Sequence, residues 1–220
     1  FSSSLDTCYS RVSMSIAVED IGVAILAGGK SSRMGTDKGL VLLEGLPLIE
    51  RITRQISHLF ANIFIVTNKP EEYSQFGYPM VSDLVEDVGP LGGIYTALDY
   101  DTHDYTLILS CDMPFVSQGI LLYLLKAAEK HQAVVPRMDK FSHPEPLRAV
   151  YRSDCQMEIY KYLQTGGRKV VGFYEAIDVR YVESGEIEEI DPGAGSFFNA
   201  NTPQDLVKAA RLTKYYPLKE

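Results

Sequence analysis

IGVAILAGGKSSRMGTDK, residues 21–38, is the stretch of sequence that decides the fold. Its first part, residues 21–26, is a short apolar run, which predicts a buried strand. Glycine, serine and basic residues then predict a loop over residues 27–38. A helix is predicted after this loop, because apolar residues recur there at helical spacing: Leu48, Ile49, Ile52, Ile56 and Leu59. The start of the chain therefore predicts strand, loop, helix.

Strands and helices continue to alternate along the chain. Apolar runs predict strands at residues 63–66, 79–81, 106–109, 133–135, 147–151 and 179–182. Helices are predicted at residues 91–98, 117–130 and 153–164 and from Pro203 onward, with Ser117 as an N-cap. We predict a turn at residues 166–169 and an acidic loop that runs through Asp191.

This order of elements predicts an α/β fold. Continuous apolar strands separated by helices indicate a mostly parallel sheet covered on both faces, a three-layer Rossmann-like sandwich. We predict a single domain over residues 16–215 and a disordered leader or added tail over residues 1–15. In such sheets ligands bind at the carboxyl ends of the strands, so the loops that leave four strands should meet in one crevice. Those loops follow Leu26, Val66, Val81 and Leu109.

Composition excludes several classes of protein. The chain has 220 residues with 21 Lys and Arg against 29 Asp and Glu, and this net charge of −8 opposes non-specific binding to nucleic acid. No apolar run approaches the ~20 residues needed to cross a bilayer. Cys8, Cys111 and Cys155 lie far apart, which fits neither a disulfide framework nor a structural zinc site. We therefore predict a reducing compartment, the cytoplasm.

The loop at residues 27–38 has the chemistry of a phosphate site. Gly28 and Gly29 allow the backbone to approach an anion closely, and successive N–H groups can surround it. Arg33 and Lys38 supply cations that can neutralise charge on an α-phosphate and a departing pyrophosphate. The loop lacks both the Walker A pattern and G-x-G-x-x-G. On these residues alone, a flexible glycine turn with a solvated basic face is the alternative.

The string LAGGKSSRMGTDK closely resembles the LAGGxSxRMGxDK signature of the molybdenum cofactor guanylyltransferase family, within the Rossmann-like nucleotidyltransferases. Three further stretches match the family in the right order, so the resemblance runs from about Ile21 to Leu206. It implies that Arg33 and Lys38 are catalytic and that Leu26, Ala27, Gly28, Gly29 and Lys38 bind the nucleotide.

A second matching stretch contains Asp83 and the sequence GPLGG at residues 89–93. By resemblance this aspartate recognises guanine, and the loop that includes Gly92 shapes the nucleotide pocket. A carboxylate can accept hydrogen bonds from the N1–H and 2-amino groups of guanine, which adenine lacks. The resemblance also assigns Asn68 to the nucleotide. From its residue type alone, Asp83 could equally be a turn or cap residue.

The third stretch, SCDMP at residues 110–114, resembles the family's CDxP motif, whose aspartate binds Mg²⁺. Asp112 is therefore the predicted metal ligand and part of the nucleotide site. The ligand preference of Mg²⁺ supports this assignment, because a hard dication prefers oxygen ligands and is often held by one or two carboxylates together with substrate phosphates. Taken alone, a strand-end aspartate is as often a helix cap. Cys111 is predicted to be a small buried core residue.

The fourth stretch, NANTP at residues 199–203, resembles the family's NxNTP segment, in which two asparagines lie near the nucleotide and metal. Thr202 is also a candidate cap for the helix at Pro203. We assign Asn199 and Asn201 to the acceptor side of the site, together with three residues that match the pterin side of the family: His143, Arg168 and Lys169. As isolated residues, these last three are more often solvated surface.

The resemblance implies an enzyme that transfers GMP from GTP to molybdenum-molybdopterin, with Mg²⁺ as cofactor. It also implies a protein that delivers molybdopterin and an apo-molybdoenzyme that receives the product; no nucleic acid and no membrane is expected as a partner. Two alternatives stay open. One is a related nucleotidyltransferase that uses CTP or a sugar phosphate, and the other is a non-catalytic nucleotide-binding module.

Overall fold

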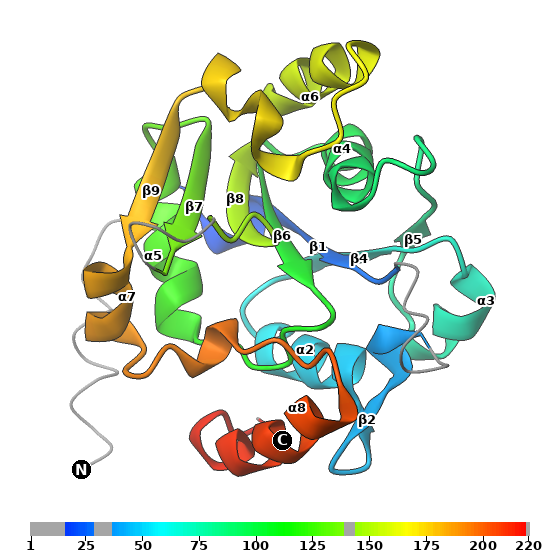
Figure 1. Ribbon diagram of the computed structural model, residues 1–220, viewed down its shortest axis with the longest axis vertical. Helices are drawn as coiled ribbons and strands as arrows, with labels where there is room; N and C mark the ends of the chain where they lie inside the picture. The colour runs from blue at the N-terminus through cyan, green and yellow to red at the C-terminus, as the bar shows by residue number, and fades with distance from the viewer. Residues whose placement is uncertain (1–15, 29–36, 139–143, 219–220) are drawn as a thin grey trace.

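The computed structural model describes residues 16–28, 37–138 and 144–218, so the prediction for residues 1–15 lies outside the described chain. A seven-stranded sheet forms the centre of the molecule (Figure 1), with strand order β5-β4-β1-β6-β8-β7-β9. In that order the strands are β5 (Met80–Val81), β4 (Asn62–Val66), β1 (Ile21–Leu26), β6 (Tyr105–Ser110), β8 (Arg148–Arg152), β7 (Ala133–Arg137) and β9 (Val179–Glu183).

The sheet is mostly parallel, as predicted. β1 pairs in parallel with β4 and β6, and β4 pairs in parallel with β5. β8 is the exception, because it runs antiparallel to β6 and β7, whereas β7 and β9 are parallel. The loops after Leu26, Val66, Val81 and Leu109 therefore leave the same edge of the sheet, as predicted, and their meeting in one crevice stays a prediction.

Helices cover both faces of the sheet and complete three layers (Figure 1). On one face lie α4 (Pro90–Tyr100) and α6 (Cys155–Gln164), and on the other lie α2 (Leu48–Ile56), α5 (Gln118–Ala128) and α7 (Ser184–Ile190). Alternate residues of β1 enter the two cores: Val23 and Ile25 pack with α2 and α5, and Ala24 packs with α4 and α6. Because β1 is buried on both faces, its sequence is a continuous apolar run.

The caps predicted from the sequence are present. Ser117 accepts a hydrogen bond from Ile120 N at 3.4 Å and begins α5. Thr202 caps α8 (Pro203–Leu212) through a reciprocal pair with Asp205, in which the side chain of each residue accepts from the backbone N–H of the other. This capping box fixes the direction in which residues 199–201 enter the helix.

The predicted acidic loop before Asp191 is wrong, since residues 184–190 form helix α7. Glu183 and Glu186 satisfy its first N–H groups through a capping box, and Ile187 is buried against the sheet. The helix is too short to show a repeating apolar pattern, so its acidic residues led to the prediction of a loop. The sequence also missed α3 (Pro70–Tyr73) and the hairpin of β2 (Leu42–Leu43) and β3 (Leu46–Pro47).

Within the described ranges, no helix is both long and apolar enough to cross a membrane. Cys111 and Cys155 are buried free thiols, as predicted for Cys111. Burial raises the pKa of both thiols, and the carboxylate of Asp112 adds to the effect at Cys111. A thiol held protonated is a poor nucleophile, which fits a core role for Cys111.

Candidate nucleotide site

The carboxyl ends of β1 and β6 bring two of the sequence motifs together. Pairing continues beyond the strands, since Cys111 N donates to Leu26 O at 3.2 Å and Ala27 N donates to Val66 O at 2.9 Å. Leu26 and Ala27 are buried, whereas Gly28 is exposed where the chain leaves the sheet. The glycine-rich loop and Asp112 therefore start from neighbouring positions at this edge.

Lys38 is the centre of the described site. It lies in a 3₁₀ turn, η2 (Lys38–Leu40), and its Nζ donates to Asp112 Oδ2 at 3.1 Å and also to Asn201 Oδ1. The side chains of Lys38 and Asp112 are 26% and 18% exposed, so a ligand can still reach this ion pair. Residues from three distant parts of the sequence thus form one polar cluster.

Two contacts that the sequence did not reveal hold Asp112. Ser110 Oγ donates to Asp112 Oδ1 at 2.6 Å, and Ala200 N donates to the main-chain oxygen of Asp112 at 2.8 Å. The second contact ties the Asn199–Asn201 segment to the end of β6. Ser110 lies inside the SCDMP motif, so its position beside the aspartate was the available signal.

Asp37 anchors the turn that carries Lys38. Its carboxylate accepts from Gly39 N at 3.3 Å and from the hydroxyl of Tyr73 in α3, and Lys69 Nζ lies 3.8 Å away. A Cβ on Gly39 would stand 2.6 Å from the Tyr73 hydroxyl, so the glycine is needed for this close approach. The sequence did not predict the Tyr73 contact because α3 was missed.

Asn68 and Asp83 form a reciprocal pair at the ends of β4 and β5. Asn68 Nδ2 donates to Asp83 Oδ2 at 3.0 Å, and Asp83 N donates to Asn68 Oδ1 at 2.9 Å. Burial raises the pKa of the Asp83 carboxyl; the Asn68 hydrogen bond opposes this shift, and the charge of Glu86 adds to it. The structure thus joins the two residues that the sequence assigned separately to the nucleotide.

Gly92 is buried in the first turn of α4. A Cβ there would stand 2.7 Å from Val85 O and 2.9 Å from a methyl group of Val88. Close packing of the loop that follows Asp83 against α4 therefore requires the glycine. Contact of Gly92 with the nucleotide stays a prediction.

The residues assigned to the acceptor are less closely grouped. Arg168 is exposed and donates to Asp87 O at 2.9 Å, so it contacts the loop between β5 and α4. Lys169 is exposed, and Asn199 Nδ2 lies 3.5 Å from Phe197 O. Of this group, Asn201 alone is described in contact with the Lys38 and Asp112 pair. Gly29, Arg33 and His143 lie outside the described residues.

Residues 23–178 match the family model of the MobA-like NTP transferase domain. The chain belongs to this family. It is 36% identical to a probable molybdenum cofactor guanylyltransferase from Pelotomaculum thermopropionicum over 185 residues, 84% of this chain and 89% of the relative.

Solved structures of the same fold extend this likeness. Molybdopterin-guanine dinucleotide biosynthesis protein A from Archaeoglobus fulgidus superposes with a TM-score of 0.76 at 30% identity, covering 88% of this chain and 99% of its own. The 2-C-methyl-D-erythritol 4-phosphate cytidylyltransferase from Thermus thermophilus has a TM-score of 0.65 at 18% identity, covering 88% and 98%. At that identity the second likeness shows the fold alone.

The donor set of this MobA-like site fits Mg²⁺. Asp112 offers carboxylate oxygens and Asn201 an amide oxygen, and oxygen ligands of this kind suit a hard dication that takes its remaining ligands from water and phosphate. Within the described part of the chain, no group of three or more His, Cys, Asp or Glu side chains could hold a metal by itself. With so few protein ligands, the site is better suited to a metal ion that binds together with the nucleotide than to a permanent structural metal.

Proposed function

We propose that this protein transfers GMP from GTP to molybdenum-molybdopterin, releasing pyrophosphate and forming molybdopterin guanine dinucleotide. The observation that carries the proposal is the contact of Lys38 with both Asp112 and Asn201 at the carboxyl edge of the sheet. Relatives named molybdenum cofactor guanylyltransferase support the choice of reaction.

The reaction needs positioning and charge stabilisation. A terminal phosphate oxygen of the acceptor attacks the α-phosphorus of GTP, a new P–O bond forms, and the bond to the β-phosphate oxygen breaks as pyrophosphate leaves. The acceptor phosphate is already a nucleophile, so no covalent intermediate on the protein is required. The Lys38 ammonium, which lies beside Asp112 at the carboxyl edge of the sheet, would stabilise the negative charge of the phosphates once it exchanges Asp112 for the ligand.

Asp112 would hold Mg²⁺, and Asn201, which the sequence assigned to the acceptor, would join it, because both side chains contact Lys38. When bound, the ion would draw negative charge from the phosphate oxygens and help hold the reacting groups in line. The chain's own contribution is to fix the oxygen ligands: Ser110 orients one carboxylate oxygen of Asp112, and Ala200 N holds its backbone. Both contacts keep the carboxylate aimed at the edge where the glycine-rich loop begins.

Guanine selection is proposed to lie with Asp83. Its carboxylate can accept from N1–H and the 2-amino group of guanine, and Asn68 holds it in place through two hydrogen bonds. Arg168 and Lys169 are proposed for the acceptor phosphate, since arginine and lysine are common phosphate ligands. A delivery protein for molybdopterin, an apo-molybdoenzyme as recipient and a cytoplasmic location belong to the same proposal.

Release of pyrophosphate separates this proposal from a non-catalytic nucleotide-binding module. The protein is incubated with GTP and Mg²⁺, with and without molybdenum-molybdopterin, and pyrophosphate is measured. We expect release only when the acceptor is present. Lys38→Met is expected to lower the rate by about a hundredfold, because a fixed charge near the developing anion is lost. Tight GTP binding without any acceptor-dependent pyrophosphate would favour the module instead.

A further inference from the structure

The segment that follows Asp112 is buried although it has no regular secondary structure. Met113, Phe115 and Val116 are at most 6% exposed, and residues 113–117 form neither helix nor strand. Backbone N–H and C=O groups buried in this way need hydrogen-bond partners, and a loop lacks the regular partners that a helix or sheet supplies. The position of Asp112 therefore depends on the groups that supply hydrogen bonds to the backbone of this segment.

Gln55 of α2 supplies two of these partners. Its Nε2 donates to Pro114 O at 2.8 Å, and its Oε1 accepts from Val116 N at 3.1 Å. A glutamine side chain can mimic a neighbouring strand in this way, because its amide offers a donor and an acceptor side by side. One end of the segment is thus fixed to α2.

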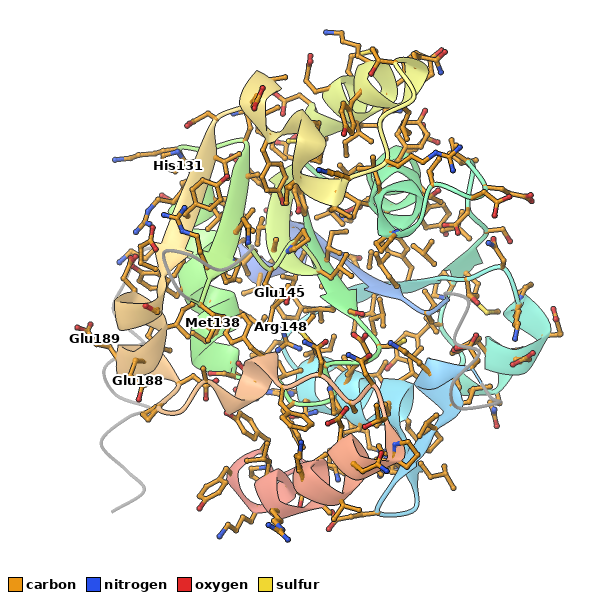
Figure 2. All side chains as sticks on the ribbon, in the orientation of Figure 1. His131, Met138, Glu145, Arg148, Glu188 and Glu189 are labelled. Atoms are coloured by element: carbon orange, nitrogen blue, oxygen red, sulfur yellow. The ribbon has the colours of Figure 1, made fainter. Side chains whose placement is uncertain are left out.

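Arg148, the first residue of β8, supplies the other partners. Its two terminal nitrogens donate to Phe115 O at 2.7 Å and to Met113 O at 2.9 Å, so one guanidinium clamps both carbonyls. The residue is 1% exposed and lies in the interior near Glu145 (Figure 2). Burial lowers the pKa of Arg148 to about 10, and the nearby carboxylates of Glu145, Asp191 and Asp112 oppose that shift. The side chain is a buried cation at neutral pH.

We propose that Arg148, together with Gln55, is a positioning residue of the transfer site, which holds the Met113–Val116 backbone so that the Asp112 carboxylate is fixed for Mg²⁺. The inference rests on the proposed function, but it concerns binding of the metal–nucleotide complex and not the identity of the acceptor. Neither Arg148 nor Gln55 is expected to touch a substrate.

Stability alone does not account for Arg148. Both described hydrogen bonds of its side chain go to neutral carbonyls, and its Nε is buried without a partner among the described residues. Burying a charge is costly, and such groups often stabilise a fold less than apolar side chains of similar size. A rigid planar guanidinium is well suited to fixing two carbonyls at once, whereas a lysine offers a single flexible ammonium.

The test is calorimetric titration of the full chain with GTP, once with Mg²⁺ and once with EDTA. Arg148→Met keeps an apolar stem but removes the donors. We expect the affinity gained from Mg²⁺ to fall by about 10- to 100-fold in this variant, the usual effect of losing a residue that supports a metal ligand. Affinity for GTP in EDTA should stay as in the wild type. In turnover with Mg²⁺, KM for GTP should rise with the lost affinity, and kcat should fall as well.

Val150→Ala is the matched control, because Val150 is fully buried two residues along on the same face of β8. It should lower the melting temperature but leave the Mg²⁺-dependent gain unchanged. Arg148→Lys should give an intermediate loss. If Arg148→Met does not fold, Gln55→Met replaces it, and we expect the same loss of the Mg²⁺-dependent gain, because Gln55 holds the same segment.

The inference is overturned if a folded Arg148→Met or Gln55→Met variant keeps the full Mg²⁺-dependent gain in GTP affinity. It is also overturned if Mg²⁺ does not change the affinity of the wild type for GTP. An equal loss in Val150→Ala overturns it too, because the effect would then follow from general destabilisation. A wild type that binds GTP with Mg²⁺ but forms no dinucleotide contradicts only the proposed function, since the titration contains no acceptor.

Discussion

Asp112 is the single side chain on which the proposed chemistry depends most. Asp112→Asn keeps the size of the side chain and an acceptor for Ser110, but removes the charge that would hold Mg²⁺. We expect pyrophosphate release to fall at least about a hundredfold, since a metal's charge stabilisation amounts to several kcal/mol. The melting temperature should change little.

Asp178→Asn is a suitable control for this variant. Asp178 pairs with His131 beside the amino ends of β7 and β9, away from the carboxyl edge that carries Asp112. The substitution Asp178→Asn also removes one carboxylate from the protein, but it should leave the rate of pyrophosphate release unchanged. Normal turnover in Asp112→Asn would remove the metal assignment.

Guanine recognition by Asp83 predicts a dependence on pH. Burial is the main cause that raises the pKa of Asp83. As pH falls, its carboxylate is therefore protonated at a higher pH than that of an ordinary aspartate, whose pKa is about 3.9, and it then no longer accepts from guanine as an anion. The KM for GTP should therefore rise toward acid pH. Asp83→Asn provides the reference, because the triphosphate titrates identically in both proteins. If the ratio of the two KM values stays constant with pH, Asp83 does not act through its charge.

At the scale of residues, the sequence predicted those that lie in recognisable motifs and missed those that support them. Lys38, Asp112 and Asn201 come from three motifs, and the structure brings them into contact. Arg148 and Gln55 lie outside any motif, since their role depends on a buried loop that only the tertiary structure reveals. A lone arginine in the apolar strand 147–151 was a signal of a buried charge that needed partners.

At the scale of elements, the cap of α8 fixes the segment that carries Asn201. Thr202→Ala removes a hydrogen bond to Asp205 N and should cost about 1 kcal/mol of stability, or roughly 2–4 °C in melting temperature for a chain of this size. Thr213→Ala, at the other end of the helix, should cost less because it removes only a bond to Ala210 O. Equal losses in the two variants would argue against the capping box.

Elements with a full apolar period were predicted well; among the short ones, β5 was predicted, whereas α3, α7 and the hairpin of β2 and β3 were not. β1, β4, β6 and α5 lie within a few residues of their predicted positions, because each buries a continuous run or a clear helical face. α8 begins at Pro203 as its cap sequence predicted, although Ala209 is its single buried residue. α7 was missed because a single buried Ile187 interrupts an acidic stretch. The antiparallel direction of β8 was not predicted, since burial on both faces leaves the same apolar pattern whichever way a strand runs.

At the scale of the whole molecule, the fold positions the site but does not choose its substrate. Because one fold can carry many functions, base preference depends on side chains, and Asp83 is the residue proposed for it. Guanine selection and nucleotidyl transfer are thus proposed to take place at one edge of the sheet.

The most direct test of that claim offers radiolabelled GTP and CTP side by side, with Mg²⁺ and molybdenum-molybdopterin, and measures dinucleotide formation. We predict that the guanine dinucleotide forms with release of one pyrophosphate per product and that CTP is used far less. Preferential formation of the cytosine dinucleotide, or no dinucleotide from either nucleotide, would contradict the proposed guanylyl transfer.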